Sequence, residues 1–245
     1  MNKSRLAKVF AEIVFMMSLG SSCLSYAAPD AVSPEAALRK AFPNVTIDSI
    51  GETAVKGMYE VVSGQNVFYY YPEKELLFFG DIVTLKGKNL TAEKKGELSA
   101  KRVQSLPLDK AVKIGNGKAV VIEFTDPDCP YCKKAYEFLK NRTDVTHYLF
   151  FSPFAHPAAI NKIHYILNAE DKTKAYHEMF EGGNPVPPAA GYSDAVKKLA
   201  QEHMNLARSV GVSGTPTFFI NGKQVVGADI QQIEQLLKDA NSQGK

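Results

Sequence analysis

The feature that most constrains this chain is a pair of cysteines, Cys129 and Cys132, placed where a strand gives way to a helix. Residues 119–124 form an almost continuously apolar run, which is typical of a strand covered on both faces of a sheet. Residues 133–140 have the composition of a helix. We therefore expect the Cys129 thiol at a helix N-terminus, where unpaired backbone N–H groups and the positive end of the helix dipole stabilise a thiolate.

A cysteine pair with this spacing can be either a redox-active dithiol or half of a zinc site. Structural zinc usually has four protein ligands, and the sequence contains no second cysteine pair and no closely spaced histidine pair. His156 and His164 stand eight residues apart and are interpreted as packing or surface residues. The dithiol is favoured, with Cys129 as the nucleophile and Cys132 as the residue that attacks the mixed disulfide and releases it. We expect no cofactor and no metal.

An acidic residue, Glu123, lies six residues before Cys129 in the apolar strand. A carboxyl group in such a strand must be paired or keep its proton. Beneath a dithiol it could relay the proton of Cys132, so Glu123 is predicted to take part in catalysis. The alternative is an outward-facing carboxylate on an edge strand.

Charged residues flank the dithiol on both sides. Asp126 and Asp128 are expected in the turn before the helix, with Asp128 as an alternative helix cap. Their charges oppose formation of a thiolate, whereas those of Lys133 and Lys134 favour it. The sequence leaves the balance between these charges open.

A proline directly before a strand marks a second part of the site. Residues 217–220 are predicted to form this strand, and a proline at that point is usually unfavourable. A cis peptide between Thr215 and Pro216 resolves the conflict and turns the Thr215 backbone toward the dithiol, where it can pair with an extended substrate. An ordinary trans turn is the alternative. The predicted substrate-binding residues are Thr215, Pro216, Pro130 and Tyr131.

Residues 107–245 show the element order of an α/β thioredoxin-like domain. Asn221 and Gly222 are favoured residues for a type I′ turn, which predicts a β-hairpin near the C-terminus. The elements after the dithiol helix are a strand at 145–151, a helical insertion at about 155–210, a hairpin of strands 217–220 and 224–226, and a closing helix at 230–241.

Residues 29–88 are predicted to form a small α+β module. Ser33 and Pro34 provide a helix cap and a first-turn proline for a helix over residues 33–42. Because many aromatic residues lie on few strands, we expect one face or edge of the sheet to need a partner. Turn residues separate the four predicted strands, at 45–50, 58–62, 67–71 and 76–79.

The mostly polar stretch 89–106 is predicted to be a linker helix capped by Thr91. A surface helix packed on one domain is the alternative.

Residues 1–28 have the pattern of a secretory signal peptide. Basic residues precede an apolar run, and small residues follow it, with cleavage expected near Ala27 or Ala28. The run is shorter than the roughly 20 apolar residues that a spanning helix needs. The alternative is lipid attachment at Cys23.

Removal of the signal leaves Cys129 and Cys132 as the only cysteines, so no structural disulfide framework is expected in an oxidising compartment. The formal net charge of the whole chain is only +3. So balanced a surface gives no reason to expect a nucleic-acid partner.

Two segments resemble the periplasmic disulfide isomerases of the DsbC/DsbG family. Residues 124–133 are similar to the active-site segment of that family, and residues 212–216 are similar to its cis-proline loop. Residues 29–88 look like its dimerisation domain, which implies a cystatin-like fold, and 89–106 like its connecting helix. The resemblance covers essentially the whole chain after the signal.

This resemblance implies a homodimer whose two dithiols face a shared cleft. It also implies a periplasmic isomerase that acts on misoxidised or unfolded exported proteins and is kept reduced by a membrane electron donor of the DsbD type. Two departures matter. Asn168 stands near where DsbC has a cysteine of its extra disulfide, and Glu123 is more familiar from thioredoxin and DsbA-like oxidases. The second departure leaves the direction of electron flow open.

The leading functional hypothesis is therefore a disulfide isomerase or reductase, with reduction of cysteine sulfenic acids as a variant. A DsbA-like dithiol oxidase is the main alternative. A dimeric holdase chaperone with secondary redox activity and a copper carrier are the others.

Overall fold

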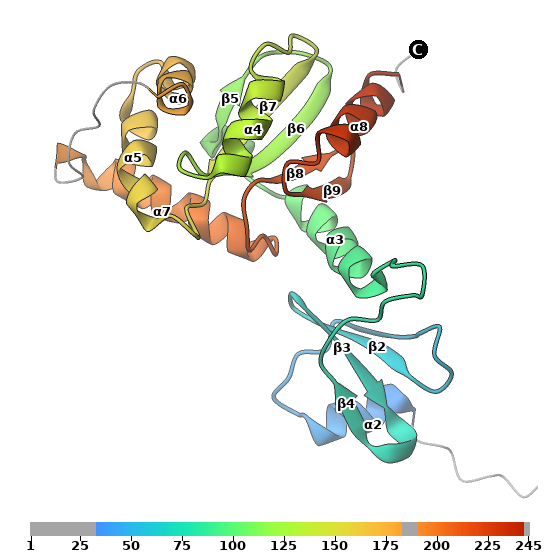
Figure 1. Ribbon diagram of the computed structural model, residues 1–245. Helices are drawn as coiled ribbons and strands as arrows, with labels where there is room; N and C mark the ends of the chain where they lie inside the picture. Colours follow the sequence, from blue (N-terminus) through green and yellow to red (C-terminus); the bar gives the residue numbers. More distant parts are fainter. Residues whose placement is uncertain (1–32, 183–190, 243–245) are drawn as a thin grey trace, which may run out of the picture. The chain divides into compact units, whose positions relative to one another are not determined.

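The structure, a computed structural model, describes residues 33–182 and 191–242 (Figure 1). The chain divides into two compact units after Pro43. The first unit contains helix α2, Pro34–Ala41, which begins where the cap residue and the proline predicted it. The Ser33 hydroxyl accepts the backbone N–H of Ala36, at 3.2 Å. The predicted signal peptide and Cys23 lie outside the described residues.

The second unit begins with an antiparallel sheet in the order β1-β2-β3-β4. Its last strand is an edge strand, because β4 pairs only with β3 among the described residues. The first strand begins later than the predicted residue 45. The residues before it are not part of the paired ladder, although the Asp48 N–H donates to the Val62 carbonyl. The strands are β1 Ser49–Glu52, β2 Tyr59–Ser63, β3 Asn66–Tyr71 and β4 Leu76–Phe78, with a short 3₁₀ turn at Pro72–Lys74.

Helix α3, Leu90–Val103, follows this sheet. Asn89 caps it by accepting the N–H of Ala92, at 2.8 Å, so the predicted cap at Thr91 is wrong. Thr91 is instead fully buried, and its hydroxyl bonds the Tyr69 hydroxyl of β3. The α3 side chains thus contribute to the core beneath the four-stranded sheet.

A five-stranded mixed sheet, in the order β5-β7-β6-β8-β9, forms the centre of the remaining chain. Only β6 and β7 run parallel; the other pairs are antiparallel. The strands are β5 Val112–Ile114, β6 Ala119–Thr125, β7 Val145–Phe151, β8 Thr217–Ile220 and β9 Lys223–Val226. Asn221 and Gly222 both have positive φ, as the predicted type I′ turn requires.

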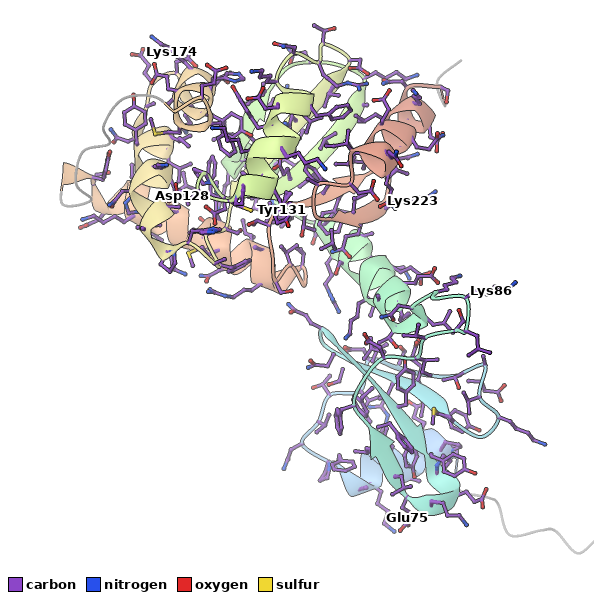
Figure 2. The ribbon with its side chains drawn as sticks, in the orientation of Figure 1. Glu75, Lys86, Asp128, Tyr131, Lys174 and Lys223 are labelled. Carbon is purple, nitrogen blue, oxygen red and sulfur yellow. The ribbon has the colours of Figure 1, made fainter. Side chains whose placement is uncertain are left out.

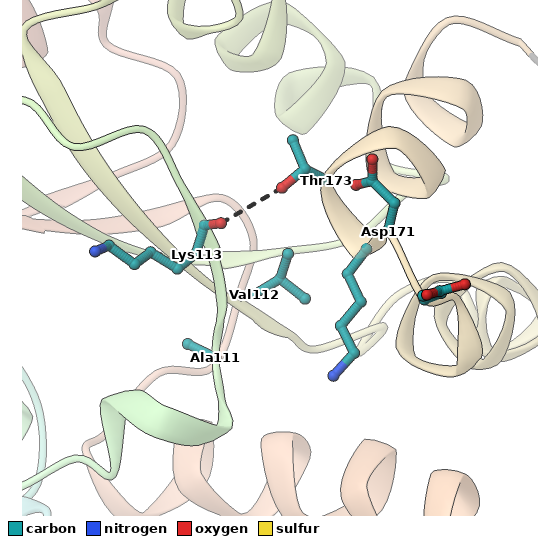
Figure 3. A pocket seen from close by; sticks show the side chains of 7 residues that line it. Ala111, Val112, Lys113, Asp171 and Thr173 are labelled. Carbon is teal, nitrogen blue, oxygen red and sulfur yellow. Dashed lines mark hydrogen bonds between the residues drawn. The ribbon is translucent and has the colours of Figure 1, made fainter.

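The short edge strand β5 was not predicted. The hydroxyl of Thr173, near the start of α6, donates to the Lys113 carbonyl of β5 at 3.4 Å, beside a surface hollow (Figure 3). Within the described ranges, the domain also contains 3₁₀ turns at Leu108–Lys110 and Pro157–Ala159 and five helices. The helices are α4 Pro130–Leu139, α5 Ile160–Asn168, α6 Lys172–Phe180, α7 Asp194–Ser209 and α8 Ile230–Ser242.

Alternate residues of β6 face opposite sides of this sheet. Val121 packs in a cluster with side chains of α4 and α8, whereas Phe124 packs with side chains of α3 and α7. The strand is therefore covered on both faces, as its apolar run predicted. This is the expected thioredoxin-like α/β fold with a helical insertion. Among the described residues, no helix has the length and apolar character needed to cross a membrane.

Candidate active site

Cys129 lies at the junction between β6 and α4. It is the N-cap residue of α4, and Pro130 occupies the first helical position. Its backbone N–H bonds the Asp126 carbonyl at 3.1 Å, and its carbonyl accepts the N–H of Lys133 at 3.0 Å. The side chain makes no capping hydrogen bond. The thiol therefore stands beside the free N–H groups of the first turn, as predicted.

The carbonyl of Thr215 faces this thiol. The distance from Cys129 Sγ to the Thr215 oxygen is 3.4 Å, which is within hydrogen-bond reach for sulfur. The peptide between Thr215 and Pro216 is cis, so the predicted conformation is confirmed. Pro216 is buried, and its carbonyl accepts the N–H of Gly227, which fixes the loop to the end of β9.

Cys132 lies one turn into α4 and has no exposed surface, whereas Cys129 keeps 5%. Burial, followed by the negative charge of Glu123, raises the pKa of the Cys132 thiol. Cys132 therefore holds its proton in the resting dithiol, and a group near it must remove that proton before it can attack.

Glu123 lies in the middle of the sheet and is 1% exposed. The alternative of an outward-facing residue on an edge strand is therefore wrong, because β6 is flanked by β7 and β8. Its Oε2 lies 2.8 Å from Nε2 of His147, on β7. The two groups are close, but their alignment does not meet the geometry of a hydrogen bond.

A histidine and a lysine from the region of the helical insertion contact the two aspartates that precede the dithiol. His156 Nδ1 lies 2.8 Å from Oδ2 of the fully buried Asp126, and Lys162 Nζ lies 2.5 Å from Oδ1 of Asp128. The second oxygen of Asp126 accepts the Asp128 N–H at 2.9 Å. Because Cys129 is the cap of α4, the alternative role of Asp128 as a helix cap is wrong.

These pairs add two partners to the balance of charges around the dithiol that the sequence left open. The Lys162 ammonium group offsets the negative charge of Asp128, and the His156 ring lies against the carboxylate of Asp126. Lys134 donates to the carbonyl of Ala228, at 3.2 Å, while Lys133 remains exposed. Sequence reasoning missed His156 and Lys162, because only the fold brings them to the dithiol.

The other two predicted substrate-binding residues lie on the surface of the first turn of α4. Pro130 is exposed, and Tyr131 is 64% exposed. Figure 2 shows Tyr131 and Asp128 near the start of this helix. In the described ranges, no group of three or more His, Cys, Asp or Glu side chains could hold a metal ion.

Comparison with known proteins assigns two segments of the chain to domain families. Residues 106–241 match the model of the thioredoxin-like domain. The chain belongs to the thioredoxin-like family. Its residues 25–92 match the N-terminal domain of disulfide bond isomerase proteins, so this thioredoxin-like chain also carries the N-terminal domain of DsbC.

Curated relatives of this thioredoxin-like chain bear the DsbC name. A probable thiol:disulfide interchange protein DsbC of Bordetella pertussis is 32% identical over 70% of this chain and 61% of that relative. The chain thus matches less than two thirds of that relative's length. Thiol:disulfide interchange protein DsbC of Haemophilus influenzae is 25% identical over 90% of this chain and 96% of the relative. Proteus mirabilis ScsC in a transitional conformation, 21% identical, has a TM-score of 0.51 over 60% of this chain and 81% of its own and shows the fold alone.

Proposed function

We propose that this protein is a thiol-disulfide isomerase and reductase that rearranges wrong disulfides in exported proteins. The observation that carries the proposal is the pairing of two unlike cysteines. Cys129 caps a helix beside the Thr215 carbonyl, and Cys132 is fully buried near Glu123. The names of the DsbC relatives support the same reaction class.

In the proposed reaction, the Cys129 thiolate attacks one sulfur of a substrate disulfide. A mixed disulfide forms, and the other substrate sulfur leaves as a thiolate with the electron pair. Isomerisation ends when a substrate thiolate attacks this adduct and restores the Cys129 thiolate. Reduction ends when Cys132 attacks Cys129 instead, which oxidises the dithiol and releases a reduced substrate. Glu123 is the proposed acceptor of the Cys132 proton.

The substrate is proposed to lie across the exposed first turn of α4 and the loop before β8. Pro130 and Tyr131 offer apolar surface there, and Thr215 with Pro216 offers backbone next to the thiol. An unfolded, extended segment fits such a surface better than a folded one, because its backbone groups are free to pair.

The assembly is proposed to be a homodimer that forms at the edge of the four-stranded sheet. The match of residues 25–92 to the DsbC N-terminal domain supports this. So do the exposed apolar residues at the β4 edge, which are Leu76, Phe78 and Phe79. We further propose that residues 1–28 direct export to the periplasm. A membrane donor of the DsbD type would there reduce the dithiol.

A matched pair of cysteine variants tests the proposed function. In refolding of a substrate with scrambled disulfides, Cys129→Ser should lower the rate at least a hundredfold. Cys132→Ser should keep much of the isomerisation but accumulate mixed disulfide, because only reduction needs the second cysteine. Rescue that survives Cys129→Ser would instead identify a holdase chaperone.

The DsbA-like oxidase remains the second candidate, because Glu123 lies beneath the dithiol. The redox potential of the dithiol against glutathione bears on the direction of electron flow. A value near about −270 mV indicates a reductase, and one near about −120 mV is compatible with an oxidase or an isomerase. A monomer that oxidises reduced substrates efficiently would favour the oxidase.

A further inference from the structure

Three buried polar atoms beneath the dithiol lack a hydrogen-bond partner in the described structure. They are both carboxylate oxygens of Glu123 and Nε2 of His147. The side chains are 1% and 9% exposed, and the shortest distance between them is 2.8 Å. Because buried polar groups are nearly always hydrogen-bonded in proteins, such a cluster calls for a physical explanation.

The sheet places the two side chains on one face. β6 and β7 run parallel, with Val121 opposite His147 and Glu123 opposite Leu149. Directly paired residues point to the same face of a sheet, as do residues two apart on one strand. His147 therefore shares a face with Glu123 and lies two residues closer to the amino ends of the strands. Cys129 follows the carboxyl end of β6. His147 therefore extends from Glu123 away from the substrate site.

A small cavity continues in the same direction. Its volume is about 30 Å³, which is room for about two water molecules. His147 lines it from the buried side, whereas Arg142 and Lys140 at its rim are partly exposed. Its other polar lining residues are Tyr136, Tyr176 and His177. Water in this cavity can therefore connect His147 to solvent.

The titratable groups around the cavity are already engaged with partners. The Tyr136 hydroxyl lies 2.8 Å from His177 Nδ1 and donates to Glu181 at 3.0 Å. Burial, followed by the hydrogen bond to Glu181, raises the pKa of Tyr136. Burial and the charge of Glu123 raise that of Tyr176, so neither phenol yields a proton at neutral pH.

The cations at the rim are neutralised. Arg142 pairs with Asp144 and Glu234, and Lys140 pairs with Glu137 and Glu181. On β5 the charged neighbour is Lys113, which is exposed. Among the described groups that line the cavity, His147 is thus placed to exchange a proton with Glu123 and with cavity water.

We propose that His147 is a positioning residue that lies against Glu123 and passes its proton to the cavity, so that the proton of Cys132 leaves at the end of the sheet opposite the substrate. The proposal rests on the proposed function. A substrate bound to Cys129 covers the thiol side of the site and shuts out water there. A second exit lets the release step proceed while that side is covered.

The proposed release step moves one proton and exchanges one disulfide bond for another. Cys132 gives its proton to the Glu123 carboxylate, and the Cys132 thiolate attacks the Cys129 sulfur of the mixed disulfide. The bond between Cys129 and the substrate sulfur breaks, and the substrate leaves as a thiolate with the electron pair. The Cys129–Cys132 disulfide forms, and Glu123 returns to the carboxylate by passing its proton to His147 and then to water.

Rapid mixing of the reduced protein with excess fluorescent peptide disulfide separates the two steps. The first phase, attack by Cys129, depends on peptide concentration, and the second, release by Cys132, does not. His147→Gln should leave the first phase within twofold of the wild type and slow the second about tenfold. The matched control is His164→Gln, since His164 is also a buried histidine of this domain but contacts Tyr192 instead of the dithiol.

Two further variants distinguish proton transfer from a structural role. His147→Ala opens space in the cavity, and free imidazole should restore its second phase. Leu139→Phe fills the cavity from α4 with His147 intact, and it should also slow the second phase. A slow second phase that imidazole does not restore, or a normal second phase in His147→Gln, overturns the proposal. Absence of the first phase in the wild type would instead overturn the proposed function.

Discussion

The four-stranded sheet and the five-stranded sheet both carry many aromatic residues but bury them to different extents. Phe124 and Phe218 of the five-stranded sheet have no exposed surface, and Phe124 stacks on Phe150 with centroids 5.4 Å apart. At the edge of the four-stranded sheet, Phe78 is 43% and Phe79 is 77% exposed. The aromatic residues of one sheet are buried in its own core, whereas the edge of the other sheet exposes apolar surface, where we propose that a second copy packs. The dithiol and the proposed dimer interface thus lie on different sheets.

Replacing a buried aromatic ring should have the largest effect on stability. Phe124→Ala should lower the free energy of unfolding by about 3–5 kcal/mol, because it leaves a cavity in a well-packed core. Phe79→Ala, its counterpart at the other sheet, should lower it by only about 0.5–1.5 kcal/mol in the monomer, because the exposed ring loses mainly its stacking contact with Phe68. Denaturant unfolding measures both. Equal losses would show that the two sheets do not differ in the way described.

Acid should weaken the five-stranded sheet through His203. Burial lowers the pKa of this side chain to about 4, and its ring nitrogens bond the Phe151 N–H and the Lys110 carbonyl. The unfolded chain takes up a proton near pH 6.5 and the folded chain only near pH 4, so stability is complete above pH 6.5 and falls as the pH drops between these values. The loss should reach about 3 kcal/mol.

His203→Gln is the control for this acid effect. The variant should be less stable than the wild type at pH 7, because a flexible amide replaces the rigid ring that bonds both the Phe151 N–H and the Lys110 carbonyl. Its stability should then depend less on pH between 6.5 and 4. An unchanged slope of unfolding free energy against pH would assign the effect to other groups.

A negative charge at the exposed β4 edge should weaken the proposed dimer without changing the reactivity of the dithiol. Phe79→Asp should raise the dissociation constant of the proposed dimer about thirtyfold, which corresponds to roughly 2 kcal/mol. Analytical ultracentrifugation measures it, and alkylation of Cys129 should keep its rate. Val226→Asp places the same charge on an exposed residue of the five-stranded sheet. If only that control dissociates the dimer, the interface lies elsewhere.

The smallest effect concerns the core under the four-stranded sheet. Tyr69→Phe removes a hydroxyl that bonds the buried Thr91, and it should cost about 1 kcal/mol of unfolding free energy. Thr91 keeps its bond from the Ile82 N–H, at 2.9 Å, which limits the loss. Tyr71→Phe should have no measurable effect, because its hydroxyl bonds an exposed carboxylate. A larger loss at Tyr71 than at Tyr69 would contradict this account.

Local pattern predicted much of the catalytic domain. The strands at 145–151 and 217–220 have the expected bounds. The dithiol lies at the start of a helix, and the peptide before Pro216 is cis. These features depend on residues close in sequence, namely an apolar run, a turn residue or a proline next to a strand. Such signals survive without knowledge of the fold.

The rest depends on residues that only the fold brings together. His147 meets Glu123 from the neighbouring strand, and His156 meets Asp126 across 30 residues, so neither pair has a spacing that sequence could flag. β5 is too short, at three residues, to show alternation. Thr91 resembles a cap in sequence, but it is buried because its hydroxyl pairs with Tyr69 and Ile82 instead.

The contact between Cys129 and Thr215 joins residues 86 positions apart. A chain that is still emerging from the ribosome therefore carries both cysteines well before it carries the loop that faces them. Until the last strands have formed, the dithiol lacks the backbone surface on which we propose that a substrate is aligned. Because the chain is made from its N-terminus, the complete site forms only when the thioredoxin-like domain is almost fully synthesised.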